Sequence, residues 1–297
     1  MKAKVGKVFG VWICALLMWQ SLAPGQLRAE ESPVGPRAEV KASTLSGEQI
    51  NGDKGEHDYY QTGVSFSYQP IRLSFENRVY NWDEAKLRQL PFGNGRDDPW
   101  KHLRSLEVSA GKELRLDQDW SCFLELGALA AYEDSFGGFG GKLRGWGGYD
   151  LSPDLRARAG GRLYAYQAGM GTIIPELALD YKLDNPSGLS ASLGIPDAHL
   201  KYAFSPRAAL RLAAWLDRDT YRLAEDSTVR RDGYLENSRY LGGLFLDLRP
   251  FQDLRLSLGL TRSLDGTMTT FDKDGDNSKE YDLEGTWGGA LSLDYRF

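Results

Sequence analysis

The chain has 297 residues, a net charge of −5 at pH 7, 41% hydrophobic residues, and generous numbers of Gly, Tyr and Trp. After residue 19 it has no apolar run of the about 20 residues that a transmembrane helix needs. An acidic chain is not a general nucleic-acid binder, so we expect no nucleic-acid partner, and we expect no cofactor. Modest hydrophobicity with many aromatic residues is typical of a membrane β-barrel, because only one face of each strand meets lipid.

The N-terminus has the layout of a secretory signal peptide. Three lysines, the last of them Lys7, precede an apolar stretch over 8–19, and a looser segment ends at Ala29. We predict cleavage after Ala29, so that residues 1–29 are a signal peptide. Cleavage removes four positive charges and no acid, which leaves a net charge of −9. Cys122 then remains as the single cysteine, so no intramolecular disulfide is expected.

The rest of the chain predicts one domain of alternating strands. Residues 30–56 are interpreted as a periplasmic N-terminal segment, with an extra strand near 37–45 as an alternative, and residues 57–297 as an outer-membrane β-barrel. Apolar residues alternate with polar ones at period two, which indicates half-exposed strands. The alternating segments are 60–68, 71–79, 106–116, 124–132, 143–151, 155–163, 177–183, 189–204, 210–216, 244–248, 254–260 and 283–297.

The connections are of two kinds. Tight turns are expected near Pro70, Asp117, Pro153, Pro186, Pro206 and Pro250. Longer polar connections fall at 82–101, 133–138, 168–172, 224–233 and 263–280. Short turns on one side and long loops on the other are typical of membrane barrels, whose short side is periplasmic.

One segment leaves the strand count open. The apolar face is odd-numbered over 189–195 and even-numbered over 200–204, so the phase changes at Pro196-Asp197-Ala198. A bulge inside one long strand gives about 12 strands, which we favour. A turn gives thirteen, and the segment near 37–45 supplies a fourteenth, which fits the alternation of short and long connections better. The fold class predicted is an all-β, antiparallel, up-and-down transmembrane barrel.

Two resemblances support this class. Leu193-Gly194-Ile195-Pro196, followed by Tyr202 and Ser205-Pro206, resembles the central motif of an uncharacterised outer-membrane β-barrel family, known only as a domain of unknown function. The resemblance implies an outer-membrane barrel and carries no known activity or site residues.

The end of the chain resembles the recognition strand that outer-membrane barrels present to their assembly machinery. The residues that form this assembly signal are Trp287, Leu291, Leu293, Tyr295 and Phe297. The resemblance implies export to the bacterial outer membrane, with the assembly machinery, lipid and lipopolysaccharide as partners. We expect a monomer.

Catalytic and metal-binding patterns are incomplete. Barrel enzymes that act on lipid use a His and a Ser two residues apart on one strand, and none of the three histidines has such a partner. Asp272, Asp274 and Asp276 resemble a calcium loop, but Gly275 and a twelfth-position Glu do not fall at EF-hand spacing. We therefore predict no enzyme and no metal site, and we read the acidic run as turn chemistry.

The connection 82–101 contains a pattern of one or two helical turns from Asp83 to Leu90, with Pro91 as a stop. Two arrangements stay open. The connection either folds into the barrel and narrows it or forms an exterior loop.

The polar faces are predicted to line the lumen, because alternation sends them inward. The predicted lumen-lining residues are Arg72, Glu76, Arg78, Arg144, Arg156, Arg158, Arg162, Glu176, Asp180 and Arg211. The stripe of three arginines at 156–162 either attracts anions or is neutralised by the acids of the next strand, and we favour pairing. The predicted function is a narrow channel or transporter for small polar or anionic solutes. A structural or adhesive barrel with a salt-bridged, closed lumen is the first alternative, and a barrel enzyme acting on lipid is the second.

Overall fold

The computed structural model describes residues 35–52, 54–182 and 187–297. The predicted signal peptide over 1–29 and the turn at Pro186 lie outside the described residues. The strands are β1 (Arg37–Gln49), β2 (Glu56–Tyr68), β3 (Ile71–Trp82), β4 (His102–Arg115), β5 (Trp120–Tyr132), β6 (Phe139–Ser152), β7 (Leu155–Tyr166), β8 (Gly171–Lys182), β9 (Gly188–Ile195), β10 (Ala198–Ser205), β11 (Ala208–Arg222), β12 (Tyr234–Leu248), β13 (Leu254–Phe271), β14 (Lys279–Leu283) and β15 (Trp287–Arg296). Two 3-10 turns, η1 (Leu87–Gln89) and η2 (Gln167–Gly169), are the helical elements of the described ranges. Neither has the length or the apolar character to cross a bilayer.

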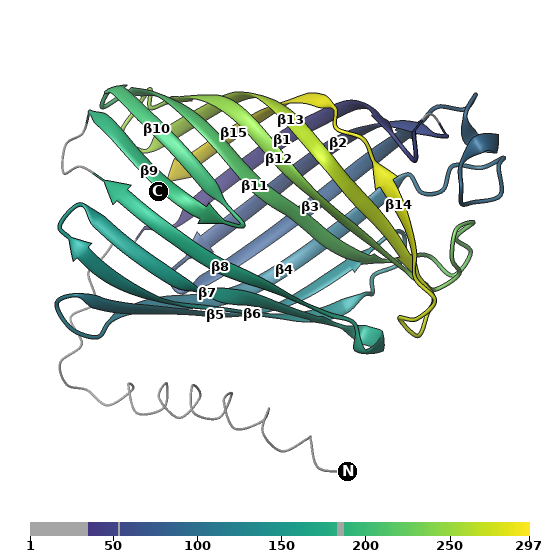
Figure 1. Cartoon of the computed structure of the whole chain (residues 1–297), viewed down its shortest axis with the longest axis horizontal. Helices are drawn as coiled ribbons and strands as arrows, with labels where there is room; N and C mark the ends of the chain where they lie inside the picture. Colours follow the sequence, from purple (N-terminus) through teal and green to yellow (C-terminus); the bar gives the residue numbers. More distant parts are fainter. Residues whose placement is uncertain (1–34, 53, 183–186) are drawn as a thin grey trace, which may run out of the picture.

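The strands form one closed antiparallel barrel (Figure 1). From β1 to β13 each strand pairs with the next along the chain, and β13 also pairs with β15. The ring closes where β1 pairs with β15 from Arg37↔Arg296 to Leu45↔Gly288. Fourteen strands make the ring, and β14 lies outside it, paired with the outer part of β13. The predicted all-β, antiparallel barrel is therefore confirmed.

The favoured count of twelve strands is wrong, and the turn interpretation is right. β9 ends at Ile195 and β10 begins at Ala198, so 196–197 is a hairpin turn. Leu200 pairs with Ala191, and since paired residues share a face, the apolar face passes from odd to even numbers. β1 supplies the fourteenth strand, so the part of the segment 30–56 from Arg37 to Gln49 belongs to the barrel wall. The predicted connection 263–280 is shorter as well, because β13 and β14 reduce it to 272–278.

The predicted strand over 283–297 is broken. Residues 284–286 separate β14 from β15, and Leu283 is 1% exposed while Trp287 is 55% exposed. The backbone N–H of Thr286 donates to the Ser263 hydroxyl at 2.9 Å. A Cβ on Gly285 would lie 2.7 Å from the Ser263 carbonyl oxygen, so only glycine fits this break.

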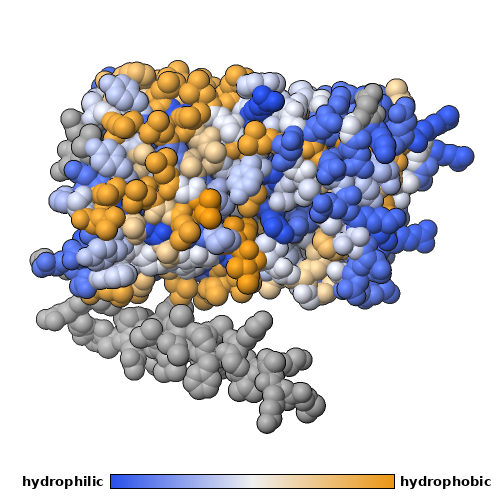
Figure 2. Space-filling view, in the orientation of Figure 1, coloured by the Kyte–Doolittle hydropathy of each residue, from blue (hydrophilic) through white to orange (hydrophobic). Residues whose placement is uncertain are grey.

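The two ends of the barrel differ. The connections 83–101, 133–138, 223–233 and 272–278 gather at one end, here called the loop end, and the tight turns gather at the other, the turn end. On the face shown in Figure 2, apolar residues cover the turn-end half, and hydrophilic residues cover the loop end. Exposed outward residues such as Val64, Phe66, Leu193 and Leu291 form this apolar belt, as expected where strands face lipid.

The ring narrows towards the loop end because β11 leaves β10 and docks on β5. β10 is short and pairs only with the first half of β11, up to Ala214. The tip of β11 makes a parallel bridge from Arg222 to Tyr132. The backbone N–H of Glu133 donates to the Arg222 carbonyl at 2.9 Å. At this level the ring passes through β1 to β5 and β11 to β14, closed by the bridge between Ile50 and Leu283. Nine strands thus enclose the loop end, whereas fourteen enclose the turn end.

The end of β7 covers the outside of the β11 tip. Thr220 and Tyr221 point to opposite faces of β11, yet they are 3% and 1% exposed. The side chains of Thr220 and Tyr166 from β7 are hydrogen-bonded. Both faces of the tip are therefore buried, one inside the nine-strand ring and one beneath the neighbouring sheet.

Closure of the ring can be tested at two adjacent glycines of β15. A Cβ on Gly288 would lie 1.8 Å from the backbone oxygen of Thr44 on β1, whereas a Cβ on Gly289 meets nothing closer than 3.7 Å. Overpacking against backbone costs about 1–3 kcal/mol or more. We expect Gly288→Ala to lose the heat-modifiable, fast-migrating band of the folded barrel on electrophoresis, and the control Gly289→Ala to keep it. Equal folding of both variants would contradict the closure geometry.

Candidate functional site: the barrel interior

Two adjoining cavities occupy the wide half of the barrel. The first, at the turn end, holds about 450 Å³, and the second, further in, holds about 400 Å³. Both are lined by Glu39, Ser257 and Ser292, and together they are here called the vestibule. Fourteen strands enclose more space than side chains fill, whereas a ring of about eight strands is just filled by them.

The vestibule ends at a buried ion-pair network that crosses the barrel. Arg78 from β3 is 1% exposed, and its Nη2 lies 2.9 Å from Asp217 Oδ1 on β11 and bonds Asp219 as well. β3 and β11 are not neighbours in the wide ring, so these pairs span the interior. The rings of Tyr59 and Tyr221 lie 5.6 and 5.7 Å from the Arg78 guanidinium. Charge-assisted hydrogen bonds of this kind hold opposite walls together.

A second buried network adjoins the first. Arg239 Nη1 lies 2.5 and 2.6 Å from the two oxygens of Glu48, and His57 Nε2 lies 3.1 Å from Glu48 Oε2. Arg239 Nε lies 3.5 Å from Asp217 Oδ2, which joins the two networks. Glu48, His57 and Arg239 are at most 2% exposed. The charges are thus removed from water and depend on each other for compensation.

An apolar cap closes the loop end above these networks. Trp82 donates through Nε1 to the carbonyl of Trp100 at 2.7 Å, and the two rings meet edge to face at 5.2 Å. Phe92 stacks on Trp100 at 5.6 Å, and Leu87 is buried beside them. The connection 82–101 therefore folds into the barrel end, the first of the two arrangements left open by the sequence. Only the 3-10 turn η1 forms where one or two helical turns were expected.

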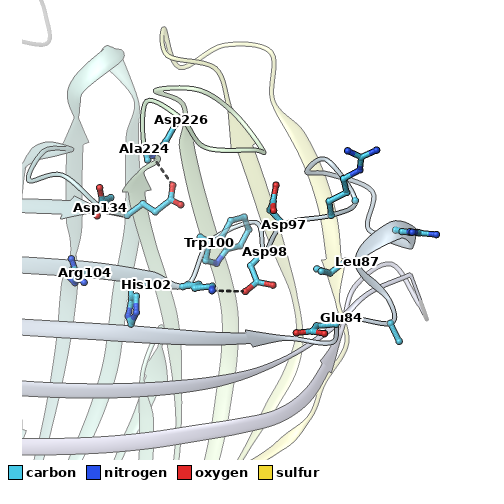
Figure 3. A pocket seen from close by; sticks show the side chains of 16 residues that line it. Glu84, Leu87, Asp97, Asp98, Trp100, His102, Arg104, Asp134, Ala224 and Asp226 are labelled. Carbon is cyan, nitrogen blue, oxygen red and sulfur yellow. Dashed lines mark hydrogen bonds and ion pairs between the residues drawn. The ribbon is translucent and has the colours of Figure 1, made fainter.

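A rim pocket of about 1000 Å³ lies on the outer side of this cap (Figure 3). Its side chains come from the connections 83–101, 133–138 and 223–233 and from the first residues of β4, His102 and Arg104. Burial raises the pKa of the Glu133 carboxyl; the N–H of Ala224, which donates to it at 2.8 Å, opposes the rise, and the nearby Asp226 and Asp134 carboxylates add to it. The pocket carries six carboxylates and four Lys or Arg side chains, so its rim is acidic.

Each arginine of the predicted stripe is ion-paired. Arg156 Nε lies 2.5 Å from Asp150 Oδ1, and Arg158 Nη2 lies 2.9 Å from Asp180 Oδ1. Arg162 bonds Glu176 and, at the tip of the β9–β10 hairpin, Asp197. The same Glu176 accepts from Arg144 Nε at 3.0 Å. The structure thus holds this stripe in the paired arrangement and leaves no open line of positive charge along β7.

The remaining predicted lumen-lining residues are also paired. Arg72 lies 3.5 Å from Glu39, Glu76 bonds Lys41 and accepts from Gln61 at 2.7 Å, and Arg211 lies 2.9 Å from Asp247.

Arg78 was predicted from the sequence as a lumen-lining residue, whereas Glu48, Asp219 and Arg239 were not. Asp217 and Asp219, two residues apart on one strand, share a face. That spacing was the available signal for a charged cluster on β11.

The weak calcium candidates form a turn. Asp272 Oδ1 accepts from the backbone N–H groups of Asp274 at 3.1 Å and Asp276 at 2.9 Å. The Asn277 amide and these backbone donors hold the pKa of the Asp272 carboxyl below its ordinary value. Across the described ranges, no group of three or more His, Cys, Asp or Glu side chains is placed to hold a metal ion.

No family model matches the chain, and no curated protein matches it. Among solved structures, an outer-membrane channel from Pseudomonas putida matches with a TM-score of 0.47 and 12% identity over 93% of this chain and 100% of that chain. The translocator domain of the autotransporter NalP from Neisseria meningitidis matches with 0.39 and 16% over 98% and 99%. The NanC porin matches with 0.39 and 11% over 88% and 100%. At these values the likeness assigns neither a family nor a function.

The buried network makes a stability prediction. Replacing Arg239 with Met leaves the Glu48 carboxylate without its main partner, and breaking a buried pair in this way costs about 3–5 kcal/mol. The matched control is Arg218→Met, since Arg218 pairs with Glu236 at 2.9 Å but is 32% exposed, where a pair contributes about 1 kcal/mol or less. We expect urea unfolding in detergent, followed by tryptophan fluorescence, to show a much larger loss for Arg239→Met. Similar losses in both variants would show that burial of the network is not what stabilises the loop end.

Proposed function

We propose that the protein is an outer-membrane β-barrel that acts as a channel for small polar solutes and is held closed at its loop end. The exposed apolar belt and the closed antiparallel ring support this location. In this proposal the turn end is periplasmic, the loop end faces outward, and the surrounding partners are lipid and lipopolysaccharide. The protein is exported by the signal peptide over 1–29, inserted as a monomer by the barrel assembly machinery, and recognised through the outward aromatic and leucine side chains of β15.

The observation that carries the proposal is a water-accessible vestibule that stops abruptly at the Arg78 network. The vestibule occupies the wide half of the barrel, and its inner wall is polar and charged. A barrel that served only as a scaffold could be filled along its whole length. An interior that holds space at one end and is closed by packed side chains at the other is the arrangement expected of a closed channel.

The device that opens it is the tip of β11. Its backbone link to β5 is one β-bridge, from Arg222 to Tyr132, which includes the hydrogen bond from the Glu133 N–H to the Arg222 carbonyl. The Ala224 N–H adds a hydrogen bond to the Glu133 carboxylate at 2.8 Å. Release of these contacts would move Asp217 and Asp219 away from Arg78, since all three depend on the position of the tip. The loop end would then widen from nine strands towards the full ring.

The alternative is a structural or adhesive barrel with a permanently closed lumen. The ion-paired stripe on β7 and the complete burial of Arg78 favour it. The two functions differ in one measurable respect. Breaking the ion pairs of Arg78 with Asp217 and Asp219 produces conductance in a channel and none in a structural barrel.

Planar-bilayer recording separates the two functions. Replacing Arg78 with Ala removes the cation that holds Asp217 and Asp219 together, and the two carboxylates then repel one another. We expect a rise in mean conductance of about tenfold or more over wild type. Arg72→Ala is the control: it lies on the same face of β3, but its side chain is 53% exposed near the turn end, and it should leave conductance unchanged.

Folding of each variant is checked by heat-modifiable migration. Should Arg78→Ala not fold, Asp219→Asn provides a milder loosening of the same network. Folded variants of this network that remain as silent as wild type would contradict the channel and leave the closed structural barrel.

A further inference from the structure

The turn-end cavity carries an excess of positive charge. Its cationic lining residues are Arg37, Lys182, Lys201, Arg207, Arg249 and Arg255. Its carboxylates are Glu39, Asp247 and Asp294. The rim pocket at the opposite end is acidic, so the two ends of the molecule differ in the sign of their local charge.

Every carboxylate of this cavity is already engaged. Asp294 bonds Arg37. Asp247 lies 2.9 Å from Arg211 and 3.8 Å from Lys201. Glu39 lies 3.5 Å from Arg72. Asp294 also attracts Arg255, which lies opposite it in the β13–β15 pair. None of the three is left to neutralise Arg207 or Arg249.

Three arginines of this cavity lack a salt bridge. Within the described ranges, Arg207, Arg249 and Arg255 form no ion pair within 4 Å and their side chains donate no hydrogen bond. Arg207 and Arg249 lie on adjacent turns, since the backbone N–H of Arg249 donates to the carbonyl of Arg207 at 2.8 Å. Arg255, near the start of β13, lines the same cavity, where the like charges of Arg249, Arg37 and Arg296 oppose the attraction of Asp294. Their mutual repulsion is relieved when an anion enters.

The structure therefore assigns an anion site to residues outside the β7 stripe. We propose that the turn-end cavity binds small soluble carboxylates or phosphates through Arg207, Arg249 and Arg255. The guanidinium groups supply planar donors suited to such oxyanions, and the Ser257 and Ser292 hydroxyls line the path inward. The cavity lies inside the ring, so its ligand comes from water rather than from the lipid that surrounds the belt.

The role of this site as the substrate site of a channel rests on the proposed function. Binding of an anion to it can be measured without any conductance. The experiment is calorimetric titration of the purified barrel in a non-ionic detergent at low ionic strength, with succinate as the anionic probe and succinamide as its neutral counterpart. Three proteins are compared: wild type, a mouth variant with Arg207, Arg249 and Arg255 each replaced by Gln, and a control with Arg88, Arg96 and Arg231 each replaced by Gln. The control removes the same charge from connections at the loop end.

We expect wild type and the loop-end control to bind succinate with equal affinity, the mouth variant to bind about tenfold more weakly or not at all, and succinamide not to bind. The mouth arginines are exposed, so folding of the variant should persist and is verified by heat-modifiable migration. Should the triple variant not fold, Arg255→Gln alone is titrated and should weaken binding about threefold. Absence of succinate binding to wild type, or equal binding to the mouth variant, would overturn the proposal. A barrel that binds succinate but stays silent in bilayers after the Arg78→Ala substitution would keep this site and reject the channel.

Discussion

The contact between the tip of β11 and β5 sets the shape of the whole interior. One bridge from Arg222 to Tyr132 takes the hairpin β9–β10 and the strands β6 to β8 out of the ring at the loop end. Nine strands leave an interior that side chains fill, and fourteen leave a vestibule. The width of the barrel thus changes along its length because two strands of eight residues stand beside strands of twelve and fifteen.

The buried charges follow from this narrowing. In a wide barrel Arg78 and Arg239 would face water, and their pairs would contribute little. In the nine-strand ring they are desolvated, so Glu48, Asp217 and Asp219 become necessary partners. The aromatic cap of Trp82, Phe92 and Trp100 excludes water above them. Closure of the loop end is therefore a joint property of strand docking, ion pairing and aromatic packing, while the turn end keeps open space and unmatched arginines.

Much of the wall could be predicted from the sequence, because alternation and turn chemistry are local properties. The hairpin turns and the all-β class were predicted from these signals, and the outward position of Tyr295 and Phe297 is shown by their exposure. The signals were weaker where two local readings were equivalent: the phase change at Pro196 fits a bulge or a turn, and only the pairing of Leu200 with Ala191 decides it. Most side-chain contacts inside the barrel could not be predicted from the sequence. Glu48 and Arg239 are 191 positions apart, and nothing near either residue indicates that β11 crosses the barrel to bring their network together with Arg78.

The proposed channel requires the β11 tip to be the movable closure of the interior. A reversible tether in the loosened Arg78→Ala background tests this directly: cysteines in place of Tyr132 and Arg222, together with Cys122→Ser, sit at bridged positions within disulfide reach. Single-channel recording is made with the disulfide formed and again after addition of a reductant, with each single-cysteine variant in the same background as a control. We expect silence in the oxidised protein and openings on reduction, with no redox effect in the single-cysteine variants. Identical conductance in the oxidised and reduced states would contradict this role of the β11 tip.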